Sequence, residues 1–181
     1  MSNSTQRWHA LYTKAGCEKK VANALSRKNI ENYCPLKREW NGKKKLALVP
    51  LLDCYVFVKI LNSDIATVRI TSSVINLIYW LGEPAIIKDE EIEIMKRFMS
   101  EYGNIKVEKM PFNENGILRE MSAETISDKA HLISVKNSTV KISLPSLGYA
   151  LVADVEKSGV DIAPTFANHY TSIHKYQYTR S

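Results

Sequence analysis

Three cysteines and four histidines are the side chains of this chain best suited to nucleophilic catalysis or metal binding. An odd number of cysteines at wide spacing matches neither a disulfide framework nor the Cys-x-x-Cys pair of a zinc site; they are Cys17, Cys34 and Cys54. The histidines lie far apart, none at ligand spacing from a cysteine, and they are His9, His131, His169 and His174. We therefore expect no metal and no cofactor, and a reducing compartment, the cytoplasm.

Acidic residues cluster only near the middle of the chain, at Asp89, Glu90, Glu91 and Glu93. Consecutive acids at the start of a helix usually form a solvated face that suits the helix dipole, so a carboxylate site is not expected there. The seven glycines form no P-loop and no dinucleotide-binding turn. We expect no enzyme; the alternative is a small enzyme that uses Cys17 or Cys34 with a histidine, which requires a thiol of depressed pKa.

Basic residues gather around Asn41-Gly42, the pair that most strongly predicts a tight hairpin turn. A hairpin would display them together at its tip, beside Trp40; they are Lys37, Arg38, Lys43, Lys44 and Lys45. Such lysines suit a phosphate backbone, and an indole can stack on an unpaired base, a contact typically worth about 1–3 kcal/mol. Residues 1–60 carry a net charge of +8 and the remainder −2, which favours a nucleic-acid partner. The alternative is a solvated run of charge without function.

The segment 55–60 is a β-branched and aromatic run that predicts a buried central strand. Because strand side chains alternate, Tyr55 and Phe57 share one face, and the aliphatic residues between them share the other. If the aliphatic face packs on helices, the two aromatic rings line an open surface with Tyr12 and Leu52. Aromatic anchors of this kind commonly carry binding energy. The alternative is that both rings belong to the core.

The pattern of elements predicts an α+β fold, an antiparallel sheet flanked by helices. Strands are expected at 8–13, 30–40, 46–50, 55–60 and 74–80, and helices at 17–28, at 65–70 and from 89 onward. A polar segment follows, and then short alternating strands at 131–135, 139–144 and 149–155 predict a small β-barrel. We therefore expect a domain at 7–101, a linker at 102–115, a barrel at 116–157 and a tail at 158–181. No apolar run is long enough for a membrane span, and residues 1–7 are polar where a signal peptide would be apolar.

Three sequence motifs resemble the N-terminal domain of the NusG family, the NGN domain. They are WHALYTK at 8–14 followed by EKKVA at 18–22, PLLDCYVFV at 50–58, and GEPA at 82–85 with Ile87. They occur in the family's order and span most of residues 7–100. The segment ISLPSLGYALV at 142–152 is similar to the last strands of the KOW barrel in UpxY-type paralogues of NusG and RfaH. Leu52-Asp53 departs from the Phe-Pro that precedes the strand in the family.

The resemblance implies a transcription elongation or antitermination factor. The clamp helices of RNA polymerase would dock on a pocket formed by Tyr12, Leu52, Tyr55 and Phe57, and the basic hairpin would contact the non-template DNA strand. The barrel would recruit a second protein, and the factor would be a monomer with no membrane association. The UpxY branch implies control of long operons such as surface-polysaccharide clusters. The alternative is a salt-sensitive nucleic-acid or ribosome-associated protein of the KOW type.

Overall fold

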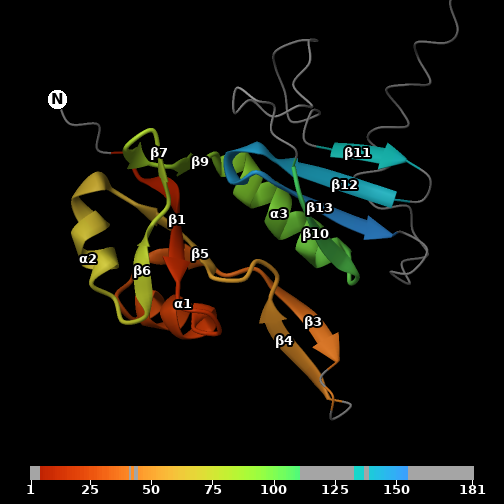
Figure 1. Cartoon of the computed structure of the whole chain (residues 1–181), viewed down its shortest axis with the longest axis horizontal. Coiled ribbons are helices and arrows are strands. Elements are labelled where there is room, and N and C mark those ends of the chain that lie inside the picture. The colour runs from red at the N-terminus through yellow and green to blue at the C-terminus, as the bar shows by residue number, and fades with distance from the viewer. Residues whose placement is uncertain (1–4, 41, 43–44, 111–132, 137–138, 155–181) are drawn as a thin grey trace, which may run out of the picture. The chain divides into compact units, whose positions relative to one another are not determined.

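The computed structural model describes residues 5–40, 42, 45–110, 133–136 and 139–154, with the backbone alone at 133–136. The chain divides into two compact units, residues 1–96 and residues 97–181, and Figure 1 labels their helices and strands. The boundary between the units falls within helix α3 (Asp89–Glu101).

A five-stranded antiparallel sheet forms the centre of the first unit. Its order is β2 (Glu31–Tyr33), β5 (Tyr55–Ile60), β1 (Arg7–Thr13) and β6 (Val74–Leu77), and β9 (Ile86–Ile87) also pairs with β1. Strands β1 and β5 pair in antiparallel orientation, from Arg7 opposite Ile60 to Tyr12 opposite Tyr55. This register decides which side chains of the two strands meet.

One face of this sheet is covered by helices α1 (Glu18–Arg27) and α2 (Ile65–Arg69), the latter following a 3-10 turn at Asn62–Asp64. Val21 and Leu25, four residues apart on α1, are fully buried, as the helical spacing predicts. They join an aliphatic core with Leu11, Val56, Val58, Ile60, Val68 and Leu77. The aliphatic face of β5 therefore packs on helices, as expected.

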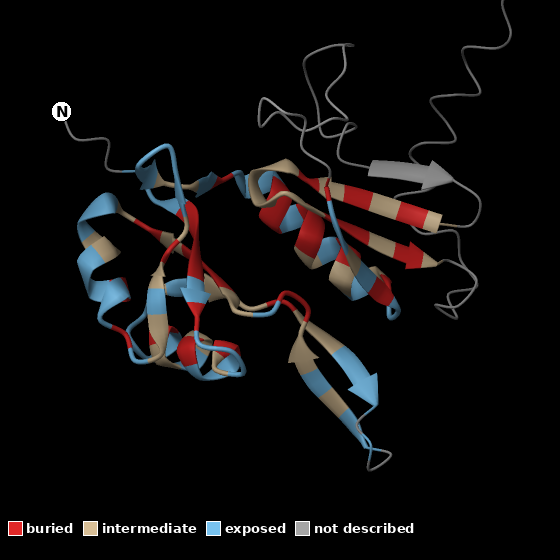
Figure 2. Ribbon diagram, in the orientation of Figure 1, coloured by how far each residue is buried: buried red, intermediate tan, exposed pale blue. Residues whose placement is uncertain are grey.

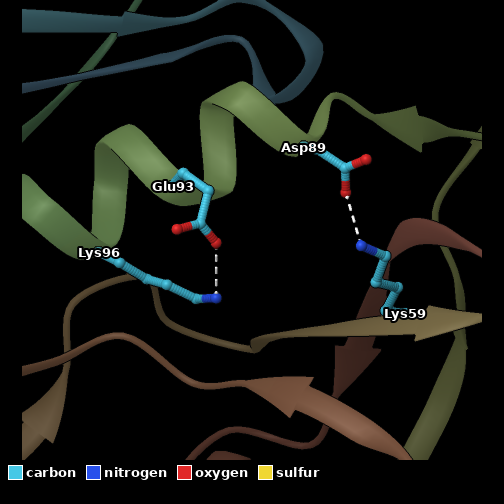
Figure 3. A network of polar contacts seen from close by, with 4 residues as sticks. All are labelled: Lys59, Asp89, Glu93 and Lys96. Atoms are coloured by element: carbon cyan, nitrogen blue, oxygen red, sulfur yellow. Dashed lines mark hydrogen bonds and ion pairs between the residues drawn. The ribbon is translucent and has the colours of Figure 1, made fainter.

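The opposite face carries Trp8 and Lys59 and meets the first turns of α3. Figure 3 shows two ion pairs there: Lys59 Nζ lies 3.1 Å from Asp89 Oδ1, and Lys96 Nζ lies 2.9 Å from Glu93 Oε1. Lys96 Nζ also lies 5.3 Å from the centroid of the buried Trp8 ring. The acids at the start of α3 were expected to be solvated. Asp89, Glu90 and Glu93 are exposed, as expected, and two of them also pair with a lysine, whereas Glu91 is buried.

Two hairpins interrupt the first unit. The predicted one joins β3 (Leu36–Trp40) to β4 (Leu46–Pro50), and Figure 1 shows it as an arm that extends from the main sheet. The expected strand 30–40 is divided because Pro35 stands between β2 and β3 and cannot donate to a ladder. The second hairpin pairs β7 (Tyr79–Trp80) with β8 (Glu83–Pro84) through a two-residue turn, where only a single turn was expected.

The second unit contains a four-stranded antiparallel sheet in the order β10 (Ile105–Lys109), β13 (Tyr149–Asp154), β12 (Thr139–Leu144) and β11 (Ile133–Lys136). The last three strands match the sequence prediction. Alternate residues form its buried side, and Figure 2 shows the alternation as banding along β12 and β13; they are Ile105, Val140, Ile142, Leu144, Leu151 and Ala153.

Strand β10 corrects the expected linker at 102–115. Residues 105–108 alternate apolar and charged side chains, and they pair along β13 from Ile105 opposite Ala153 to Lys109 opposite Tyr149. This period of two is the pattern of a half-buried strand. In the described part the four strands form an open sheet with β10 and β11 at its edges, so closure into a barrel stays a prediction. Residues 116–130 and the expected tail at 158–181 lie outside the described residues.

Within the described part, no helix is long and apolar enough to cross a membrane. The longest helix among the described residues, α3, has 13 residues.

Candidate functional surfaces: an aromatic pair and a basic hairpin

Tyr12 and Tyr55 form an aromatic pair at one end of the main sheet. They are direct partners on antiparallel β1 and β5, so their side chains leave the same face. The ring centroids are 6.2 Å apart and the planes are inclined by 70°, an edge-to-face arrangement. Tyr12 is 39% exposed, and Tyr55 is half-buried. The structure therefore brings together two of the four residues predicted to bind polymerase and leaves them accessible.

The turn before β5 holds the pair at its end of the sheet. The Tyr55 N–H donates to the carbonyl of Leu52 at 3.4 Å, and the Thr13 N–H donates to the carbonyl of Cys54 at 2.8 Å. Cys54 has a φ of 66°, in the left-handed region that L-residues other than glycine seldom adopt. Leu52, the third predicted residue, is buried within this turn and presents almost no side-chain surface.

Phe57 is fully buried, which differs from the open surface expected for it. The ring lies on the sheet between Ala10 of β1 and Tyr33 of β2, its partners on either side. The Tyr33 ring stacks on it, with centroids 6.4 Å apart and an interplanar angle of 26°. Phe57 is thus a core residue in this structure, and the polymerase contact predicted for it stays a prediction.

Tyr33 is a member of this face that the sequence did not single out. Burial, reinforced by the negative charges of Cys34 and Glu93 when ionised, raises the pKa of Tyr33 to about 12. Its hydroxyl therefore stays protonated at physiological pH. Lys96 Nζ lies 5.7 Å from its ring centroid. The three-residue strand that carries Tyr33 is too short to give a periodic signal, and only its pairing with β5 reveals its place.

The β3–β4 hairpin has two chemically different faces. Arg38 and Trp40 alternate with Lys37 along β3, so they lie on the face opposite to Lys37. Leu46 and Leu48, the cross-strand partners of Trp40 and Arg38, complete that face. The Trp40 side chain is 71% exposed, and both leucines are also exposed; Figure 2 shows most of the arm in the exposed and intermediate colours.

The second face of the hairpin is occupied by an ion pair. Lys37 Nζ lies 3.3 Å from Glu39 Oε2, which lowers the charge that Lys37 offers to a phosphate. Lys45 is exposed at the start of the returning strand, whereas Lys43 and Lys44 lie outside the described residues. Of the six predicted nucleic-acid contacts, the structure therefore groups Arg38 with Trp40 and separates Lys37 from them. Leu46 and Leu48 were not predicted as members of this face, although the alternation of leucine with Ala47 is a signal that indicates it.

The cysteines lie in the first unit as free thiols of intermediate burial. Burial, with Glu18 nearby, raises the pKa of Cys34 to about 11. A reactive cysteine needs the opposite shift, so the thiol of Cys34 lacks the property that the alternative enzyme requires. In the described ranges, no three His, Cys, Asp or Glu residues converge as metal ligands would.

Comparison with known proteins identifies the family. The family model described as "Transcription termination factor nusG" matches residues 6–96, half of the chain. A solved structure titled "Domain interaction in Thermotoga maritima NusG" matches with 17% identity and a TM-score of 0.45 over 84% of this chain and 95% of that one. A search of the curated proteins found no match. The family match contains β1, the β3–β4 hairpin and β5, and the protein belongs to the NusG family of transcription factors.

Proposed function

We propose that the protein binds RNA polymerase through the surface around Tyr12 and Tyr55 and suppresses pausing or termination during elongation. The observation that carries this proposal is the accessible edge-to-face tyrosine pair within the segment that matches the NusG family. Exposed apolar patches often mark interaction surfaces, and in this pair Tyr12 is exposed while Tyr55 is half-buried. Tyrosines that become buried on binding also frequently contribute much of the binding energy of a protein interface.

The mechanism requires no chemical step. A factor that binds the closed, elongating form of polymerase more tightly than the opened or backtracked form stabilises the elongating form by that difference in affinity. A difference of about 1.4 kcal/mol changes the ratio of the two forms tenfold. Paused states become less populated in proportion, which is the activity expected of an antitermination factor.

The hairpin adds a contact to single-stranded DNA. Arg38 and Trp40 lie on one face of an arm that extends from the sheet, and a guanidinium beside an exposed indole suits a phosphate and a stacked base. We assign this face to the non-template strand of the transcription bubble, and the C-terminal unit, completed to a KOW barrel, to a second protein. We further propose a cytoplasmic monomer that acts on long operons such as surface-polysaccharide clusters.

The test is single-round transcription by purified core polymerase on a template with defined pause sites. The protein is expected to shorten pauses in proportion to its occupancy of polymerase. Unchanged pausing at a saturating concentration of the protein would contradict the antipausing function. Longer pauses would mean that the protein promotes pausing.

A second candidate function is a salt-sensitive nucleic-acid-binding protein that does not need polymerase. The net charge of +8 in residues 1–60 favours it, together with the exposed Trp40. Binding to free single-stranded DNA or RNA at physiological salt, with no affinity for polymerase, would establish this alternative.

A further inference from the structure

A buried carboxylate ties the start of α1 to the turn before β5. Glu18 is the first residue of the helix and only 2% exposed. Its Oε1 accepts the N–H of Cys54 at 2.8 Å and the N–H of Gly16 at 3.2 Å. An acid in the first turn usually serves the N–H groups of its own helix. Here the acid accepts an N–H from a turn 36 residues further along the chain.

The residue that Glu18 holds lies next to both tyrosines of the pair. Cys54 directly precedes Tyr55, and its carbonyl accepts the N–H of Thr13, which directly follows Tyr12. Both backbone polar groups of Cys54 are thus bonded, one to Glu18 and one to the end of β1. The left-handed φ of Cys54, 66°, persists only where the surroundings determine it, and the carboxylate is the group that does so from the helix side.

The next residue of the helix holds the other end of the same segment. Lys19 Nζ donates to the carbonyl of Leu48 at 2.9 Å. The first turn of α1 therefore bonds to the chain both where the hairpin returns and where β5 begins. Segment 48–54 joins the two proposed binding surfaces, and two adjacent side chains of α1 fix its ends.

We infer that Glu18 is a positioning residue for polymerase binding: it fixes the turn at Cys54 and so sets the edge-to-face geometry of Tyr12 and Tyr55. The inference rests on the proposed function for its consequence, but the positioning itself can be measured without polymerase. Glu18 makes no contact with the partner, because it is buried.

The experiment compares Glu18→Ala with Glu18→Gln in the full-length protein, at a temperature where circular dichroism shows both folded. Glutamine keeps an oxygen acceptor at the position of Oε1, whereas alanine removes it. We expect Glu18→Ala to weaken polymerase binding about tenfold and Glu18→Gln to restore binding to within about threefold of wild type, in line with the loss of one buried charged acceptor. Val68→Ala, a buried change on α2, is the control for lost stability and should leave the affinity unchanged.

Nuclear magnetic resonance tests the positioning directly. The amide protons of Cys54 and Gly16 should move upfield in Glu18→Ala, and the contacts between the Tyr12 and Tyr55 rings should weaken. If Glu18→Ala does not fold, the substitution is made in a Cys54→Gly background, which relieves the strain at positive φ. The double variant should then bind more weakly than Cys54→Gly alone, but by less than about tenfold, because glycine adopts the positive φ without strain and only the hydrogen-bond acceptor is lost.

The outcomes separate the two claims. Wild-type protein that does not bind polymerase would refute the proposed function, while the ring contacts would still decide the positioning. Wild-type affinity or unchanged ring contacts in folded Glu18→Ala would overturn the role of Glu18, as would equal losses in Glu18→Ala and the Val68→Ala control.

Discussion

Tyr12 and Tyr55 face each other across β1 and β5 with their ring centroids 6.2 Å apart. Their contact follows from the register that places Tyr12 opposite Tyr55 and, at the other end of the strands, Trp8 opposite Lys59. A slip of one residue in either strand would move the side chains of that strand to the other face of the sheet and separate these pairs. The candidate docking surface therefore depends on the pairing of the two central strands, which the aliphatic core on the helical side stabilises.

The hairpin offers a test that separates stacking from charge. We expect Trp40→Ala to weaken binding to single-stranded DNA by about 1–3 kcal/mol while the salt dependence stays unchanged, because an indole contributes stacking and no counterion release. Arg38→Ala should weaken binding and also reduce the slope of log affinity against log salt by about 0.7, the contribution of one phosphate contact on a single strand. Titrations by fluorescence anisotropy at several salt concentrations measure both quantities.

Lys37→Ala is the matched control on the opposite face of the hairpin. Its partner is Glu39, so we expect a smaller change in slope than Arg38→Ala gives. Equal slopes for the two variants would mean that the hairpin attracts DNA by total charge, without a binding face.

The β7–β8 turn should be open to stabilisation. Leu81 has a φ of 51° and Gly82 a φ of 85°, the two positive values of a type I′ turn, for which Asn-Gly is the preferred pair. Leucine in this region costs roughly 1–2 kcal/mol, and Leu81 is 90% exposed. We therefore expect Leu81→Asn to raise the unfolding free energy by about 1 kcal/mol in chemical denaturation. Leu81→Ala, which removes the exposed side chain but keeps the strain, should give no such gain.

Stability should decrease in mild acid because of His9. Burial, with the positive charge of Arg7 nearby, lowers the pKa of His9 below its ordinary value of 6.5, although the hydrogen bond to Ala85 partly opposes this shift. The unfolded chain therefore takes up a proton near pH 6.5 that the folded protein resists. The free energy of unfolding should be constant with respect to His9 above this pH and fall below it, by at most about 1.4 kcal/mol per pH unit.

The variant His9→Asn tests that assignment. Since a carbonyl can only accept, His9 Nδ1 must donate to the Ala85 oxygen at 3.0 Å, and an asparagine amide can replace that donor. Urea titrations between pH 5 and pH 8 should show that the variant lacks the acid-dependent loss attributed to His9. An identical pH profile for wild type and variant would assign the loss to other groups.

Lys96 should stabilise the first unit mainly through its aromatic neighbours. Its Nζ lies 5.3 Å from the Trp8 centroid and 5.7 Å from the Tyr33 centroid. We expect Lys96→Met, which keeps the apolar stem, to cost about 1 kcal/mol of unfolding free energy. Glu93→Gln, which breaks the ion pair of Figure 3 and leaves the cation over the rings, should cost no more than about 0.5 kcal/mol. The reverse order in thermal denaturation would assign the stabilisation to the ion pair.

Sequence patterns predicted a helix or strand correctly where the signal lies within the element's own residues. The apolar spacing of α1, the alternation of β12 and β13, and the two paired strands of the predicted β3–β4 hairpin all appear in the structure. The strand at Ile105–Lys109 was not predicted, because its charged residues are typical of a linker. Its alternation of apolar and charged residues is nevertheless that of a strand. Its partners lie on β13, from 40 residues later in the chain (Lys109 opposite Tyr149) to 48 residues later (Ile105 opposite Ala153).

The candidate site was only partly predictable, because exposure depends on what other elements cover. Tyr55 and Phe57 share a face by alternation alone, but nothing in their own segment indicates that Tyr33 lies over Phe57. The same limit applies to Glu18. Its position at the start of a helix suggests an acid that caps that helix, and only the fold brings its carboxylate to the N–H of Cys54.

The central claim is tested most directly by the affinity of core RNA polymerase for wild-type protein and for the double variant Tyr12→Ala/Tyr55→Ala. Circular dichroism must first show that the variant is folded. Tyr79→Ala is the control, since Tyr79 is an exposed tyrosine of the same unit outside the pair. We predict that the double variant loses at least about thirtyfold in affinity, about 2 kcal/mol, while Tyr79→Ala binds as wild type does. A folded double variant that binds polymerase with wild-type affinity would contradict the claim.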